Sequence, residues 1–255
     1  MRPRPSPLRR TNNLAGVPGQ AAASGPGGTA GTVWSALRAA LDWPAEGWPA
    51  RGSRDEKDMA DERWLIVGLG NPGAGYAGNR HNAGYMVADE IAARIGGRFR
   101  AGKFRSTVAD GRLDGTPVTV AKPLTYMNES GGPVAGLRGY YRLDPGHIVV
   151  IHDELDLPFG TIRLKLGGGD NGHNGLRSVS AALGTRDYNR VRVGIGRPPG
   201  RMDPAAFVLR DFSAAERKEL PFLVDRAADA VQALLSTGLG AAQNAFHGEQ
   251  RPSSG

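Results

Sequence analysis

The stretch Trp64-Leu-Ile-Val-Gly-Leu-Gly-Asn-Pro-Gly73 predicts a short buried β-strand that ends in a glycine-rich loop. Its first six residues are mainly large and apolar, as in strands that are covered on both faces. A helix is expected to begin after the loop, with Asn82 as its N-cap. Val87, Ile91 and Ile95 recur four apart and would share one face of that helix. Strand, loop and helix together predict the start of an α/β domain.

Beyond this start, the chain alternates strand-like and helix-like segments. Such alternation predicts an α/β fold: a single three-layer domain with a mixed, largely parallel central sheet flanked by helices. The turn-forming pair Asp114-Gly115 predicts one hairpin within it. The further elements expected are hairpin strands over 104–110 and 117–122, strands over 147–151 and 189–195, and helices over 128–143, after Asn174 and after the capping box that begins at Ser213.

The first 58 residues differ in composition from the rest. They are rich in Pro, Gly, Ala and Ser, with no acidic residue before Asp42, so we expect a disordered extension over 1–58. Its arginine-rich beginning resembles an organelle targeting segment, and a true start at Met59 is an alternative. A folded domain is expected over 59–247, followed by a flexible tail over 248–255.

Composition narrows the classes of chemistry. The 255 residues carry a formal net charge of +7, which favours a polyanionic partner, although an arginine-rich composition imposed by a GC-rich genome is an equal explanation. The absence of Cys excludes disulfides, thiolate zinc sites and a cysteine nucleophile, and it fits a reducing cytoplasm. No apolar run reaches the roughly 18 residues of a transmembrane helix, so we expect no membrane partner and a cytoplasmic location.

The glycines of the first loop match the dinucleotide fingerprint G-x-G-x-x-G over Gly68–Gly73. That fingerprint places its third glycine in the opening helix and an acidic residue about 20 positions on. Here the third glycine is followed by loop residues, and Pro72 lacks the N–H that would face a pyrophosphate. A nucleotide-binding enzyme is therefore an alternative, but a weak one.

Two residues are candidates for acid–base chemistry. His81 lies just before a predicted helix N-terminus, where the helix dipole disfavours a charged imidazole, so it is suited to act as a general base. Asp153 follows the strand over 147–151, at the edge of the sheet where α/β folds bind ligands. A carboxylate there would orient the imidazole. The alternatives are a surface histidine and a salt-bridged acid; no metal-ligand spacing is found.

Residues 163–177 form the most distinctive stretch, in which cations flank consecutive glycines and Asn174 stands at a predicted helix start. Glycine-rich backbone permits close approach of a ligand and exposes N–H donors. The simpler alternatives are a mobile linker and, for Asn174 and Asn128, plain helix caps.

Taken together, these segments resemble the bacterial-type peptidyl-tRNA hydrolase family. The resemblance runs from about Trp64 to Phe246, and six blocks occur in the family's order. They are Val67-Gly-Leu-Gly-Asn-Pro-Gly73, Gly75-Tyr76, Arg80-His-Asn-Ala-Gly84, Lys122-Pro-Leu-Thr-Tyr-Met-Asn128, His152-Asp-Glu-Leu-Asp-Leu-Pro158, and Gly167-Gly-Gly169 with Gly172-His-Asn-Gly-Leu176.

The resemblance implies hydrolysis of the ester between peptide and tRNA, with His81 as the general base on water and Asp153 keeping it in its proton-accepting form. It implies that Asn71 distinguishes N-blocked peptidyl esters from free aminoacyl-tRNA. It also implies that tRNA is the partner and that no metal, cofactor or obligatory protein partner is needed, with the protein as a monomer. The other implied contacts with the tRNA end, the peptide or phosphates are Tyr76, Tyr126, Asn128, Asn174, Arg163 and Lys165.

Two departures from the family pattern stand out, Asp170-Asn171 inside the glycine-rich loop and Phe159 where a second proline is common. The charge of Asp170 is expected to weaken phosphate attraction slightly. Two other functions remain open at this point. A non-catalytic RNA-binding module needs neither His81 nor Asp153, and some relatives with this fold act in organellar splicing.

Overall fold

The computed structural model describes residues 63–248. The predictions made for residues 1–58 and for a start at Met59 lie outside the described residues, as does nearly all of the expected tail over 248–255. Among the helices of residues 63–248, none has the length and apolar character that crossing a bilayer requires.

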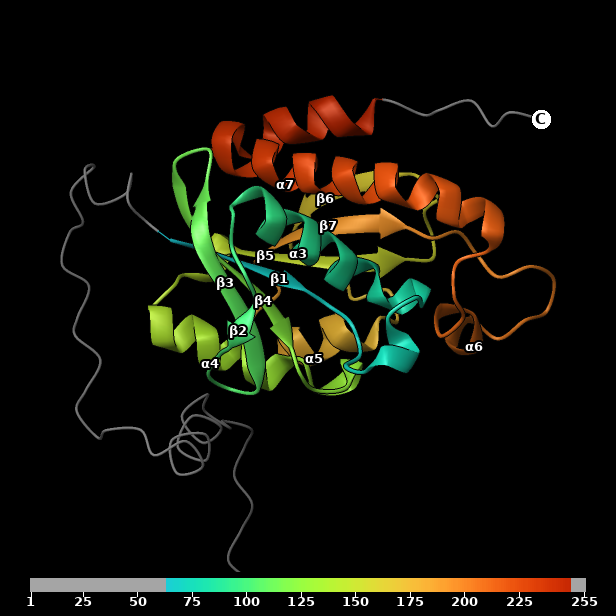
Figure 1. Cartoon of the computed structure of the whole chain (residues 1–255), viewed down its shortest axis with the longest axis horizontal. Helices are drawn as coiled ribbons and strands as arrows, with labels where there is room; N and C mark the ends of the chain where they lie inside the picture. The colour runs from blue at the N-terminus through green and yellow to red at the C-terminus, as the bar shows by residue number, and fades with distance from the viewer. Residues whose placement is uncertain (1–62, 249–255) are drawn as a thin grey trace, which may run out of the picture. The chain divides into compact units, whose positions relative to one another are not determined.

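A seven-stranded mixed sheet forms the middle layer, in the order β2-β3-β4-β1-β5-β7-β6 (Figure 1). The four central strands, β4, β1, β5 and β7, pair in parallel, and the outer pairings are antiparallel. The predicted mixed sheet is confirmed, with its parallel part confined to the centre. The strands are β1 (Trp64–Gly68), β2 (Arg100–Ala101), β3 (Ser106–Leu113), β4 (Thr116–Pro123), β5 (Ile148–Glu154), β6 (Ile162–Leu166) and β7 (Asn189–Gly194).

Helices cover both faces of the sheet, which confirms the three-layer architecture (Figure 1). Helices α3 (Ala83–Arg94) and α7 (Ala214–His247) cover one face, and α4 (Gly131–Tyr141) and α5 (Asn174–Leu183) cover the other. Because neighbouring strand residues point to opposite faces, Val149 of β5 packs into the core beneath α3 and α7, and Val150 packs into the core beneath α4 and α5. The short elements are η1 (Ala74–Tyr76), η2 (Arg80–Asn82), η3 (Met127–Glu129), η4 (Pro145–His147) and α6 (Pro204–Val208).

Several local predictions are confirmed and others are wrong. The hairpin through Asp114-Gly115 and the capping box at Ser213 both form. Asn82 precedes α3, but its side chain does not cap that helix, and at α5 the cap is His173 instead of Asn174. The strand β6 was not predicted, because only two of its five residues are buried and glycines follow at once.

Two glycines permit the close contact that places the loop after β1. A Cβ on Gly68 would lie 2.2 Å from the carbonyl oxygen of Gly84, and one on Gly84 would lie 2.3 Å from the carbonyl oxygen of Ile151. Both obstacles are backbone atoms, which cannot move aside as a flexible side chain can. The first turn of α3 therefore lies directly against β1 and β5, which brings the residues just before α3 to the carboxyl ends of these strands.

We predict that Gly84→Ala destabilises the fold by roughly 1–3 kcal/mol, because the added methyl meets backbone on two sides. Gly240→Ala is the control, since that glycine lies in α7 two residues after the backbone kink at Gly238, with open space around it. There the added methyl meets no atom, so the free energy of unfolding should change by no more than about 0.5 kcal/mol. Urea unfolding midpoints measure both, and equal midpoints for the two variants would refute the close-contact explanation.

Candidate active site

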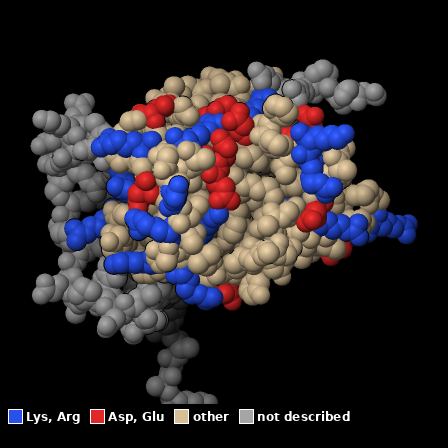
Figure 2. All heavy atoms as spheres, in the orientation of Figure 1, with Lys and Arg blue, Asp and Glu red and all other residues tan. Residues whose placement is uncertain are grey.

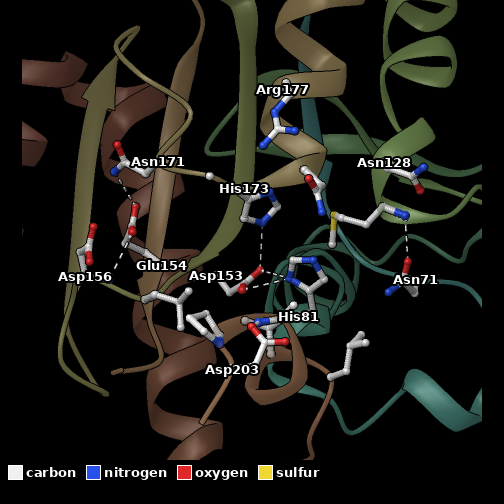
Figure 3. A pocket seen from close by; sticks show the side chains of 18 of the residues that line it. Asn71, His81, Asn128, Asp153, Glu154, Asp156, Asn171, His173, Arg177 and Asp203 are labelled. Carbon is white, nitrogen blue, oxygen red and sulfur yellow. Dashed lines mark hydrogen bonds and ion pairs between the residues drawn. The ribbon is translucent and has the colours of Figure 1, made fainter. Parts of the chain in front are cut away.

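A cavity of about 970 Å³ opens at the carboxyl ends of β1 and β5 (Figure 3). This is the edge at which α/β sheets bind ligands. All the predicted site residues except Arg163 and Lys165 line it. Those that do are Asn71, Tyr76, His81, Tyr126, Asn128, Asp153 and Asn174.

The His81 side chain is held against the Asp153 carboxylate. Its Nδ1 lies 2.9 Å from Oδ1 and 3.0 Å from Oδ2 of Asp153. An ionised carboxylate accepts hydrogen bonds only, so the proton of this contact sits on Nδ1. Nε2 therefore keeps its lone pair on a ring that forms part of the cavity wall. A neutral imidazole in this tautomer can accept a proton from water.

The neighbouring residue Arg80 anchors η2, the short helix that carries His81. Its buried guanidinium donates to the carbonyl oxygen of Asp211 at 2.6 Å and to the carboxylate of Glu216 at 2.5 Å. It also lies over the Phe207 ring, 4.3 Å from the ring centre. These contacts tie η2 to α6, to α7 and to the segment between them, and so hold the backbone beside His81 in place.

A third group, His173, completes the hydrogen bonding of Asp153 (Figure 3). Its Nε2 lies 3.0 Å from Oδ1 of Asp153. Its Nδ1 accepts the backbone N–H groups of Gly175 and Leu176 and so caps α5. A nitrogen that accepts cannot carry the proton, so the proton is on Nε2 and is donated to Asp153. The sequence analysis did not predict that His173 caps α5 and binds Asp153, although its position directly before a helix start could have indicated a cap.

This hydrogen bonding shifts the pKa values of both His81 and Asp153. Burial lowers the pKa of His81, but the adjacent Asp153 carboxylate raises it more, and the net pKa lies above the ordinary 6.5. Burial likewise raises the pKa of Asp153, yet the two imidazoles that face it hold that pKa far below the usual range. Asp153 therefore stays ionised, and it stabilises the imidazolium that forms when His81 takes a proton.

A second buried histidine, His152, contacts both Asp153 and His173. His152 donates from Nδ1 to the backbone carbonyl of Asp153 at 2.7 Å, and its ring meets that of His173 edge-on at 5.0 Å. Burial, with the nearby His173 and Arg190, holds the pKa of His152 well below 6.5, so it remains neutral. His152 packs beneath the site and does not line the cavity.

Asn71 is pinned at three points. Its Oδ1 accepts the backbone N–H of Met127 at 2.8 Å. Its own backbone N–H and carbonyl are both bound by the Asn82 side chain, at 2.9 and 3.0 Å. That is why Asn82 does not cap α3. With Oδ1 engaged, the amide nitrogen of Asn71 is the donor left to meet a bound molecule.

The other predicted contact residues form the cavity walls. Tyr126 is 58% exposed, so a flat aromatic face is open to a ligand beside the site. Asn128 and Asn174 are exposed and neither caps its helix, so the capping explanation is wrong for both. Arg177, on the first turn of α5, also lines the cavity and was not predicted (Figure 3).

The two predicted phosphate ligands lie on β6 and are not among the residues that line the cavity. Arg163 donates to the carbonyl oxygen of Phe246 at the end of α7. Lys165 lies against Gly168 of the glycine-rich loop, and burial with nearby Arg192 and Arg190 lowers its pKa. Their contact with phosphates remains a prediction.

The two unusual residues of the glycine-rich loop have structural partners. Asp170 accepts from Ser180 at 2.9 Å and pairs with Arg186 at 3.3 Å, so its charge is partly neutralised. Asn171, which lines the cavity, donates to Glu154 at 3.3 Å. Part of the loop is thereby fixed over the site, which differs from the mobile-linker alternative.

The ligand atoms of His81, Asp153 and His173 lie within 4.8 Å of one another, as in some metal sites. Both ring nitrogens face the same carboxylate at hydrogen-bond distance, and each has a proton to donate there. A metal ion would have to displace both protons. The hydrogen-bonded arrangement explains the geometry without one.

Comparison with known proteins identifies the family of this chain. The family model described as peptidyl-tRNA hydrolase matches residues 65–254. A peptidyl-tRNA hydrolase of Frankia alni is 63% identical over 187 residues, which are 73% of this chain and 95% of the relative. One of Pseudarthrobacter chlorophenolicus is 62% identical over 188 residues, 73% of this chain and 96% of the relative.

Solved structures of peptidyl-tRNA hydrolases share the fold of this chain. The crystal structure of peptidyl-tRNA hydrolase from Acinetobacter baumannii superposes with a TM-score of 0.70 at 35% identity, over 78% of this chain and 99% of that one. A peptidyl-tRNA hydrolase in complex with N-propanol gives a TM-score of 0.70 at 36% identity, over 74% and 96%. Since its sequence and its fold both match, this chain belongs to the peptidyl-tRNA hydrolase family.

Proposed function

We propose that this chain hydrolyses the ester that joins a peptide to the terminal ribose of tRNA, in molecules released from or trapped on stalled ribosomes. The observation that carries the proposal is the hydrogen bond from His81 to Asp153 inside a cavity lined by amides. Family membership supports the substrate class. A module that only binds RNA would leave this buried pair without a role.

In the proposed reaction, Nε2 of His81 takes a proton from a water molecule as that water attacks the ester carbonyl carbon. The carbonyl becomes a tetrahedral centre with a negative oxygen, which neighbouring amide N–H groups stabilise. The C–O bond to the ribose then breaks. The leaving ribose oxygen recovers the proton from the His81 imidazolium, which regenerates the base and releases peptide and tRNA.

Each of the other residues is proposed to hold one part of the substrate. Asn71 donates to a carbonyl of the peptide and so favours N-blocked esters over free aminoacyl esters. Asn128 and Asn174 contact the peptide backbone or the oxyanion, Tyr76 and Tyr126 contact the tRNA end, and Arg163 and Lys165 contact phosphates. Asp153 orients His81, as its hydrogen bonds support.

We further propose that the catalytic domain spans residues 59–247 and acts as a cytoplasmic monomer. The proposed chemistry uses side chains and water alone.

We predict that His81→Ala lowers kcat for N-acetyl-aminoacyl-tRNA about 10²–10⁴-fold, the usual contribution of a general base. Binding of uncharged tRNA should be nearly unchanged, because the imidazole acts on water and not on phosphate. Radiolabelled substrate gives kcat, and filter binding gives Kd. Turnover equal to that of the unmodified protein would remove His81 from the mechanism.

The pH profile follows from the raised pKa of His81. Only the neutral imidazole accepts a proton, so kcat/KM should increase with pH and reach half its plateau above pH 6.5. In Asp153→Asn the raising effect is lost and burial remains, so the midpoint should move to lower pH while the plateau falls. A midpoint that is the same in both proteins would contradict the assignment.

The variant Asn71→Asp tests the proposed hydrogen bond from the Asn71 amide nitrogen to the substrate, while it keeps the bond that Oδ1 accepts from Met127. Aspartate keeps an oxygen acceptor for the Met127 N–H but has no N–H to donate. We expect kcat/KM for N-acetyl-aminoacyl-tRNA to fall by about 10-fold or more, as when a site hydrogen bond is left unpaired. The preference over unacetylated aminoacyl-tRNA should shrink. A retained preference would assign that selectivity to another residue.

A further inference from the structure

An exposed cationic surface lies beside the cavity and has no role in the chemistry described so far. It is formed by Lys103 and Arg105, in the loop between β2 and β3, and by Tyr140 of α4. We call it the Lys103 surface. Figure 2 shows Lys and Arg side chains gathered over the part of the molecule that carries β2, β3 and α4.

The charges of this surface are open to a ligand. Lys103 and Arg105 are exposed, and no carboxylate among residues 63–248 lies within salt-bridge distance of either. By contrast, Arg63 and Arg100 nearby both pair with Asp110. Lys103 lies over the Tyr140 ring, with Nζ 4.2 Å from the ring centre, and that ring is 48% exposed. A cation beside an exposed aromatic face suits a nucleotide chain, which offers phosphates and flat bases.

The loop that carries these cations is held in an unusual shape. Phe104 and Arg105 both adopt left-handed backbone angles, φ 57° and 52°, which cost free energy for residues other than glycine. Packing holds the loop in place, because the Phe104 ring lies against Gly136 of α4, where any Cβ would sit 2.4 Å from it. Ser106 Oγ also donates to the carbonyl oxygen of Lys103 at 2.6 Å. The two cations are thus presented from a fixed loop.

The Lys103 surface is continuous with the cavity. The carbonyl oxygen of Arg105 accepts the backbone N–H of Leu124 at 2.7 Å, directly after β4. Two residues further on, Tyr126 lines the cavity and is 58% exposed. Two residues span at most about 7 Å, and adjacent chain segments lie about 5 Å apart. The Arg105 backbone is therefore at most about 12 Å from that of Tyr126, a distance that a few nucleotides can span.

A third cation extends the surface at the end of α4. Arg142 is exposed and adopts the left-handed angles of a helix C-cap, φ 56° and ψ 41°. Glycine or asparagine is usual at such a position. The choice of arginine places another positive charge two residues beyond Tyr140.

We propose that the Lys103 surface binds the tRNA backbone a few nucleotides from the ester, so that the acceptor strand leaves the cavity past Tyr126 and Leu124. This inference rests on the proposed function, since it concerns the same substrate. It gives Lys103 and Arg105 a role in affinity for the RNA and none in the chemical step.

The test uses the full chain with both cations neutralised, Lys103→Gln/Arg105→Gln. Filter binding of uncharged tRNA at about 0.15 M salt should show a Kd raised roughly 5- to 10-fold. The slope of log Kd against log salt should fall by about 2, one for each phosphate that is no longer neutralised. The kcat for N-acetyl-aminoacyl-tRNA should be unchanged, and KM should rise. Hydrolysis of the N-acetyl-aminoacyl ester of adenosine, which lacks those phosphates, should be unaffected.

The single variants Lys103→Gln and Arg105→Gln are measured as well. Lys218→Gln is their control, because it removes one exposed charge from α7, on the opposite layer of the fold. The proposal is wrong if the double variant binds tRNA with the affinity and salt slope of the unmodified protein, or if Lys218→Gln alone weakens binding as much as either single variant. An equal loss of activity on tRNA and on the adenosine ester would also contradict the proposal, because the two cations would then act on the active site and not on the tRNA backbone. If the unmodified protein hydrolyses neither ester, the proposed function itself fails.

Discussion

The site depends on one carboxylate that accepts hydrogen bonds from two imidazoles. Asp153 lies between His81 and His173, at 2.9 and 3.0 Å. Because α5 uses the other nitrogen of His173 as its cap, that ring can only donate to Asp153. The carboxylate is ionised and held in place, and it fixes His81 with its proton on Nδ1 and its lone pair on Nε2. Burial strengthens these interactions, since there is little water to compete.

The rest of the fold serves to bring these groups together. Gly68 and Gly84 let α3 approach β1 and β5 closely enough for His81 to reach the end of β5. Arg80 ties the same segment to the first turn of α7 and to the residues just before it. The bonds between Asn71, Asn82 and Met127 join the loop after β1 to the segment after β4. Side chains distant in sequence thus share one rigid cavity edge.

Much of this was predictable from sequence, for physical reasons. The apolar run at Trp64–Leu69 and the β-branched run before Asp153 identify central strands, and strand ends in such a sheet meet at one edge. That was enough to expect His81 near Asp153. Cap chemistry was harder, because Asn174 is a stronger cap by propensity than His173, and tertiary contacts decided between them. β6 was missed because its apolar pattern is short, and that left the positions of Arg163 and Lys165 unknown.

The most direct test of this account is the protonation state of the His81 ring, measured by long-range ¹H–¹⁵N correlation spectra of the protein above the pKa of His81. We predict one proton on Nδ1 and none on Nε2, with the Nδ1 preference lost in Asp153→Asn. A ring protonated on Nε2 in the unmodified protein would contradict the account, because the nitrogen assigned to activate water would have no lone pair to do so.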